Sequence, residues 1–168
     1  MTGTGPIERD RLTTRRAEIA ATHLLARNER PASSARGVHH IALICSDVET
    51  TVDFYQGVLG FPLTEMFENR DYEGSTHFFF DIGQGNALAF FDLPGLDVAA
   101  YREVLGGLHH LAISVEPTRW EQLRRALDGA GVPYQHVDGS SLYFFDPDGA
   151  RLELISDPLG EMYGSQVV

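Results

Sequence analysis

The feature that most constrains the fold is a short motif that occurs twice. Gly37-Val-His-His-Ile-Ala-Leu43 returns as Gly107-Leu-His-His-Leu-Ala-Ile113, shifted by 70 positions. A repeat of this kind predicts two copies of one structural unit. A single copy cannot bury both a helix and the face of a small sheet, so the two copies are expected to pack together.

The same order of elements follows each motif. An amphipathic segment comes first, with apolar residues at Val52, Tyr55 and Leu59 in one half and Trp120, Leu123 and Leu127 in the other. This spacing is typical of a helix with one buried face. Three strand-like runs follow in each half, at 62–67, 76–82 and 86–92, then at 132–137, 141–146 and 150–155. The sequence therefore predicts an α+β fold of two βαβββ modules, with eight strands and a cleft between the halves.

The predicted domain organisation has three parts. Residues 1–36 form a helical extension with a linker, since a helical pattern over Ile7–Asn28 is broken at Arg30-Pro31. The domain covers 37–158, with module one at 37–95 and module two at 106–158, and 159–168 is a C-terminal tail. A leader helix of this kind could clasp a second subunit, which favours a homodimer.

Charge and composition exclude several classes of protein. Residues 1–37 carry seven arginines and four acidic residues, whereas 38–168 carry six arginines and twenty acidic residues. Nucleic-acid binding depends on clustered positive charge, so nucleic acid is not expected as a partner. No apolar run approaches the roughly 20 residues that cross a bilayer, so no membrane association is expected. A single cysteine, Cys45, is typical of a reducing cytoplasm.

Two histidines and one glutamate are the candidate metal ligands. Side chains alternate along a strand, so the two members of each His-His pair are expected to face opposite ways. His40 and His110 share their faces with small residues, which leaves room for a metal. Glu153 lies in an apolar strand, where a carboxylate needs a cation such as a metal ion or Arg151. Two imidazoles and one carboxylate form the facial triad of non-haem Fe(II) oxygenases.

Together these motifs resemble the vicinal-oxygen-chelate superfamily, which includes glyoxalase I, extradiol dioxygenases, and fosfomycin and bleomycin resistance proteins. The resemblance covers about residues 37–158 and rests on the two His-His motifs, on 53–61 and on Tyr143-Phe-Phe-Asp-Pro-Asp-Gly-Ala-Arg-Leu-Glu153. It implies a concave eight-stranded sheet around one divalent metal, held by His40, His110 and Glu153. Fe(II) is favoured, while Mn, Co, Ni and Zn stay open.

The choice of reaction depends on a missing fourth ligand. Alignment of the last strands of the two halves puts Ala89 opposite Glu153, which counts against glyoxalase-like chemistry. Three ligands leave room for a chelating substrate and for dioxygen, as in the extradiol enzymes. The resemblance then implies catalytic roles for Tyr143, ten residues before Glu153, and for His136.

Three further residues are candidates for substrate binding: Asn86, His77 and Phe145. Asn86 stands where the extradiol enzymes have a catalytic histidine, and His77 on an adjacent strand could substitute for it. Phe145 belongs to a set of aromatics that suits an aromatic substrate. The sequence thus predicts a cytoplasmic, Fe(II)-dependent, dioxygenase-like enzyme for a small aromatic or vicinal-oxygen substrate. A glyoxalase-like or other non-redox metalloenzyme and a metal-free, bleomycin-resistance-type binding protein are the alternatives.

Overall fold

A computed structural model describes residues 5–168, which divide into two compact units, 5–37 and 38–168. The first unit contains helix α1 (Pro6–His23) and a short 3₁₀ turn, η1 (Arg27–Glu29). Helix α1 ends before the predicted Asn28 because Leu24 already has extended backbone angles. No residue of α1 is buried, and no helix within residues 5–168 is long and apolar enough to cross a membrane.

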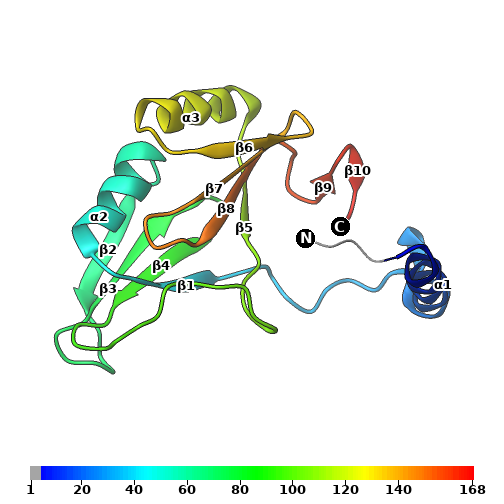
Figure 1. The fold of residues 1–168 in the computed structure, drawn as a ribbon, viewed down its shortest axis with the longest axis horizontal. Coiled ribbons are helices and arrows are strands. Elements are labelled where there is room, and N and C mark those ends of the chain that lie inside the picture. The colour runs from blue at the N-terminus through cyan, green and yellow to red at the C-terminus, as the bar shows by residue number, and fades with distance from the viewer. Residues whose placement is uncertain (1–4) are drawn as a thin grey trace. The chain divides into compact units, whose positions relative to one another are not determined.

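The second unit begins with the first βαβββ module (Figure 1). Its elements are β1 (His40–Cys45), α2 (Val48–Val52), η2 (Asp53–Val58), β2 (Leu63–Glu68), β3 (Thr76–Asp81) and β4 (Ala87–Asp92). Helix α2 starts where the Asp47 carboxylate accepts a hydrogen bond from the Thr50 amide, at 2.8 Å. The helix then widens into the π-helical segment η2, which continues the predicted amphipathic segment.

The second module repeats this order. Its elements are β5 (Leu111–Ser114), α3 (Pro117–Gly129), β6 (Tyr134–Val137), β7 (Ser141–Phe145) and β8 (Arg151–Ile155). A small hairpin that was not predicted follows, with strands β9 (Glu161–Met162) and β10 (Ser165–Gln166). The α+β class and the two βαβββ modules are therefore confirmed.

The eight main strands do not form one continuous sheet within the chain. They form two four-stranded sheets with equivalent orders, β1-β4-β3-β2 and β5-β8-β7-β6. In each sheet the first strand is at the edge and runs parallel to the last strand of its module. The prediction of an eight-stranded sheet is wrong at the level of the single chain, because the edge strands β1 and β5 do not pair with each other.

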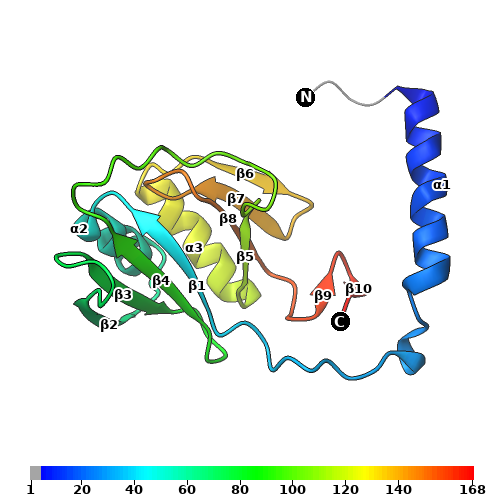
Figure 2. The same ribbon diagram turned by 90° about the horizontal axis from the view of Figure 1, so that it is seen from below.

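The two modules, whose ribbons lie side by side in Figure 2, are joined instead through a shared core of buried side chains. Within η2, Tyr55 packs against Phe80 and Phe90 of the first sheet, while Phe54 lies against Phe144 of the second. The hydroxyl of fully buried Tyr55 donates a hydrogen bond of 3.0 Å to the carboxylate of Asp146. Burial raises the pKa of this phenol and also that of Asp146. The inner faces of the two sheets are thus occupied by core.

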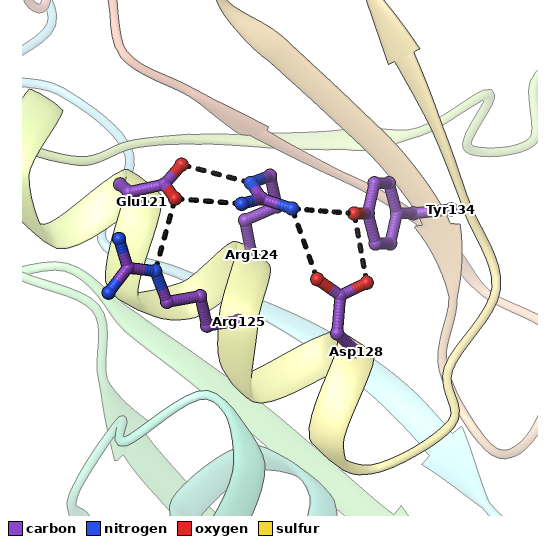
Figure 3. A network of polar contacts seen from close by, with 5 residues as sticks. All are labelled: Glu121, Arg124, Arg125, Asp128 and Tyr134. Carbon is purple, nitrogen blue, oxygen red and sulfur yellow. Dashed lines mark hydrogen bonds and ion pairs between the residues drawn. The ribbon is translucent and has the colours of Figure 1, made fainter.

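Helix α3 is tied to β6 by a polar network on its outer side (Figure 3). Arg124 pairs with Glu121 and Asp128, and it also donates to the hydroxyl of Tyr134 at 3.2 Å. Hydrogen bonding to Arg124 lowers the pKa of Glu121 to about 2. Every charged group of this network has a partner within it, so the network explains the position of α3 rather than a binding function.

Candidate metal centre

His110 and Glu153 meet on the face of the second sheet that points away from the helices. The register of β5 and β8 pairs Ala112 with Glu153, which brings the preceding His110 beside the carboxylate. The Nε2 atom of His110 lies 3.1 Å from Oε2 of Glu153. The other oxygen, Oε1, accepts a hydrogen bond of 2.6 Å from the fully buried hydroxyl of Ser141. Glu153 itself is only 2% exposed.

This geometry fits a divalent metal. Ligand atoms at about 2.1 Å from a metal and about 90° apart are separated by about 3 Å, which matches the distance between the imidazole and the carboxylate. A buried carboxylate is expensive without a cation, and Ser141 and Tyr143 supply only neutral hydrogen bonds. His110 and Glu153 therefore present the two donors that a metal would need from this sheet.

Tyr143 stands next to this pair. It is the partner of Glu153 across β7 and β8, and its ring centroid lies 5.5 Å from that of His110. Burial is the main cause of a pKa raised above the usual value for tyrosine, and Glu153 and Tyr163 add to it. Tyr143 therefore keeps its proton at neutral pH and can donate a hydrogen bond.

Sequence reasoning missed Ser141 and Tyr163 as members of this site. Tyr163 lies in the turn of the β9–β10 hairpin, and its amide donates a 2.7 Å hydrogen bond to the carboxylate of Asp157. The signal for Ser141 was available, because residues 141, 143 and 145 share one face of a strand. No pattern in the last ten residues predicted that Tyr163 would reach the neighbourhood of Tyr143.

His40 occupies the equivalent place in the first module. Its Nδ1 atom lies 2.8 Å from Nδ1 of His39, and the same pairing joins His109 and His110 at 2.6 Å. The prediction that the members of each pair face opposite ways is therefore wrong. His39 and His109 precede the strands, so strict alternation does not apply to them. Each instead lies beside the ring of the candidate ligand.

Within a single chain, His40 does not join His110 and Glu153. Among residues 5–168, no group of three or more histidine, cysteine or acidic side chains is close enough to hold a metal ion. The reason is the separation of the two sheets, since His40 belongs to the edge strand of one and Glu153 to the centre of the other. His40 has Phe79 as an aromatic neighbour, with 6.4 Å between the ring centroids.

The register supports the predicted absence of a fourth ligand. Ala42 of β1 pairs with Ala89 of β4, just as Ala112 of β5 pairs with Glu153 of β8. Ala89 thus stands at the position equivalent to Glu153 and has no donor atom. The two modules share a backbone arrangement, but only the second has a carboxylate there.

The corresponding face of the first sheet is aromatic. His77 stacks on Phe91 with 3.8 Å between ring centroids, and Phe67 and Phe79 flank it at 5.2 and 4.3 Å. Burial is the main cause of a lowered pKa for His77. Its Nε2 atom is buried and has no hydrogen-bond partner within the described part of the chain. We call these four residues, Phe67, His77, Phe79 and Phe91, the aromatic platform.

Of the three remaining predicted residues, one lies on the open face of the second sheet and two do not. Phe145 lies on the open face of the second sheet, across from Arg151, and is 59% exposed. His136 pairs with Leu142 and its ring packs on Trp120, which places it on the opposite, helix-covered face. The amide of Asn86 donates to the Gly83 carbonyl at 3.0 Å and so holds the turn before β4. Within the described residues, neither His136 nor Asn86 lies on the open face beside His110 and Glu153.

Two βαβββ modules, each with a His-His pair before or at an edge strand, define a duplicated fold with a polar open face in its second half. The chain belongs to the Glyoxalase/Bleomycin resistance protein/Dioxygenase superfamily, which it matches over residues 37–154.

Individual members of the superfamily differ in the activity that their names state. MhqO of Bacillus subtilis (strain 168), named as an inferred ring-cleaving dioxygenase, is 31% identical over 141 residues, which are 77% of this chain. The chain spans 43% of the length of MhqO and of a second such relative, MhqA. Metallothiol transferase FosB of Shouchella clausii is 29% identical over 74% of the chain and 83% of its own length.

A solved structure supports the fold. The glyoxylase/bleomycin resistance protein/dioxygenase domain from Frankia sp. EAN1pec is 25% identical, with a TM-score of 0.62 over 73% of this chain and 98% of that domain. The likeness therefore extends over nearly the whole of that domain.

Proposed function

We propose that the protein is a metal-dependent enzyme whose metal is held by His110 and Glu153 of one copy and by His40 of a second copy. One observation carries the proposal: a carboxylate buried to 2% exposure, held by Ser141, faces His110 at 3.1 Å. Membership of the superfamily supports a divalent metal. Fe(II) suits two imidazoles and one carboxylate, and Mn, Co, Ni and Zn have overlapping preferences.

Two features favour a second copy as the source of His40. The strands β1 and β5, which carry or follow the two histidine pairs, are both at the edges of their sheets. The outward faces of the sheets also expose large apolar side chains, with Ile44 at 49%, Phe67 at 43% and Phe145 at 59%. Exposed apolar surface of this kind is typical of an interface. A two-fold dimer would cover both faces and form two equivalent sites.

For the reaction, we propose ring cleavage of a small aromatic diol. A bound metal would order the two substrate oxygens and activate dioxygen. The aromatic platform would support the substrate ring, because offset or edge contacts between aromatic rings are favourable. Tyr143 would donate a hydrogen bond to a substrate oxygen, since its raised pKa keeps the phenol protonated. The relatives MhqA and MhqO, inferred ring-cleaving dioxygenases, support this choice.

A non-redox metalloenzyme is the second candidate, and one observation favours it. His136, one of the positions expected to serve ring cleavage, lies on the helix-covered face, and Asn86 has an amide rather than an imidazole that could transfer a proton. His77 is then the remaining candidate for a catalytic histidine, and it lies in the aromatic platform of the first module.

The test is anaerobic loading with Fe(II), followed by oxygen uptake on a panel of aromatic 1,2-diols. We expect one iron per chain and oxygen consumption with at least one diol, matched by a ring-opened product. Tight iron binding without oxygen consumption on any diol would favour the non-redox enzyme. A chain that takes up no metal would overturn the proposal.

A further inference from the structure

Arg151 lies on the same open face as Glu153 and is not used by the metal centre. The two residues are two positions apart on β8, so their side chains leave the strand on one side, about 6.6 Å apart along it. The guanidinium carbon of Arg151 lies 4.8 Å from the ring centroid of Tyr143, which is the cross-strand partner of Glu153. Tyr143 thus stands beside both the carboxylate and the cation.

The guanidinium of Arg151 has only a weak ion-pair partner among the described residues. The nearest carboxylate within residues 5–168 is that of Glu103, whose Oε1 lies 4.0 Å from Nη1 of Arg151. The same oxygen is 3.5 Å from His109, and the Glu103 side chain is 61% exposed. Exposed ion pairs of this kind contribute little to stability, so a better-placed anion can replace Glu103.

By contrast, Arg124 and Arg125 pair with acidic residues of their own helix at 2.7 to 3.1 Å. Arg151 is 27% exposed along its side chain, lies over an aromatic ring, and has only the 4.0 Å contact with Glu103 as an ion pair. A planar guanidinium fork fixed in this way suits bidentate recognition of a carboxylate.

We propose that Arg151 is a specificity-determining residue that binds a carboxylate substituent of the substrate. This rests on the proposed function, in which two ring oxygens of the substrate lie near His110 and Glu153. The guanidinium of Arg151 lies over the ring of Tyr143, the cross-strand partner of Glu153, so a substrate ring held beside Glu153 can present a substituent to Arg151. The preferred substrate class is therefore a dihydroxybenzoate, with the carboxylate on the far side of the ring from the chelating oxygens.

The experiment measures binding of three probes without oxygen, to protein loaded with Fe(II). The probes are 3,4-dihydroxybenzoate, its methyl ester and unsubstituted catechol. We expect the acid to bind at least tenfold more tightly than the ester. Arg151→Gln should abolish this preference and leave the affinities for the ester and catechol unchanged within twofold. Arg151→Lys should keep part of the preference, because a lysine retains the charge but not the fork.

Arg125→Gln is the matched control, since it removes an exposed arginine that pairs with Glu121 on α3. It should leave all three affinities unchanged. Equal weakening of all three probes by Arg151→Gln would mean a structural role and would overturn the proposal, as would a retained preference for the acid. Thermal unfolding of each variant shows whether it is folded, and Arg151→Lys serves if the glutamine variant is not.

The metal-free protein separates this inference from the proposed function. Benzoate and benzyl alcohol differ in the carboxylate but need no metal, and we expect benzoate to bind more tightly only where Arg151 is present. A chain that binds no metal but keeps this preference would remove the proposed function and leave the role of Arg151 intact. No preference for benzoate, together with no preference for the dihydroxybenzoate, would remove the role of Arg151.

Discussion

The two modules have the same strand order and the same register, yet their open faces differ in chemistry. Ala89, Phe79 and His77 of the first module occupy the positions of Glu153, Tyr143 and Ser141 in the second. One face is therefore aromatic, and the other has a carboxylate, a phenol and a hydroxyl. Under the proposed function, the duplicated fold divides one site between a module that holds the metal and a module that contacts the substrate ring.

Glu153→Gln should have the largest effect on the difference between the two open faces, because it removes the carboxylate that the second face has and the first lacks. A neutral amide is a poor metal ligand and leaves His110 without its partner at 3.1 Å. Loss of supporting residues alone lowers metal affinity about 10–100-fold, so loss of the ligand should exceed about 100-fold. Equilibrium dialysis with Fe(II) or Zn(II) checks this. Glu116→Gln, at an exposed carboxylate before α3, should bind metal normally.

Ser141→Ala should have a smaller effect of the same kind. It removes the 2.6 Å hydrogen bond that orients Oε1 of Glu153 and leaves both ligands in place. We expect a decrease in metal affinity of about 10–100-fold. The neighbouring Ser140→Ala is the control, since Ser140 lies in the turn before β7. Equal affinities for the two variants would show that the hydroxyl does not position the carboxylate.

Tyr55→Phe tests the contact between the modules rather than the open faces. It leaves the buried carboxylate of Asp146 without the hydroxyl that donates to it at 3.0 Å. The free energy of unfolding should fall by about 1–3 kcal/mol, measured by urea denaturation. Tyr143→Phe removes a phenol from a half-buried position on the open face and should change stability less. The reverse order would mean that the core contact is not what joins the modules.

The smallest effect concerns Cys45, at the end of β1. Burial is the main cause that raises its pKa to about 11. Since the thiolate is the reactive form, the thiol should be inert to a disulfide reagent at pH 8 and should react at a normal rate in urea. The rates at which Cys45 reacts with the reagent, measured at pH 8 and pH 10 in the folded protein and in urea, check this. Rapid labelling of the folded protein at pH 8 would contradict the buried position.

Much of the fold could be predicted from the sequence because its signals are local. The repeated His-His motif, the apolar spacing around Tyr55 and Trp120, and the three strand-like runs of each half predicted the order of the elements. The alignment of the two last strands also matched Ala89 with Glu153, and the structure has these residues at equivalent positions of their sheets. The separate sheets could not be predicted, because alternation along β1 and β5 does not say which edge pairs with which.

The candidate site was predicted less completely, for the same reason. His110 and Glu153 share one sheet, so register alone brings them together. His40 lies on the other sheet, and its distance from them depends on packing between modules. The role of His136 came from the family resemblance, whereas its pairing with the core residue Leu142 turns its side chain towards Trp120. Tyr163 reaches the site through a turn with a positive φ of 52°, which no periodicity indicates.

Co-expression of His40→Ala with Glu153→Gln tests the shared site most directly. Each variant alone should bind no metal. In a mixed dimer, His40 of one copy meets His110 and Glu153 of the other, so one of its two sites is whole. Random pairing makes half of the dimers mixed, and metal binding should return to about one quarter of the wild-type level. Co-expressed His110→Ala and Glu153→Gln should bind no metal. Both of these ligands come from the same copy in each site, so every site of a mixed dimer lacks one of them. No recovery with the first pair would contradict the account.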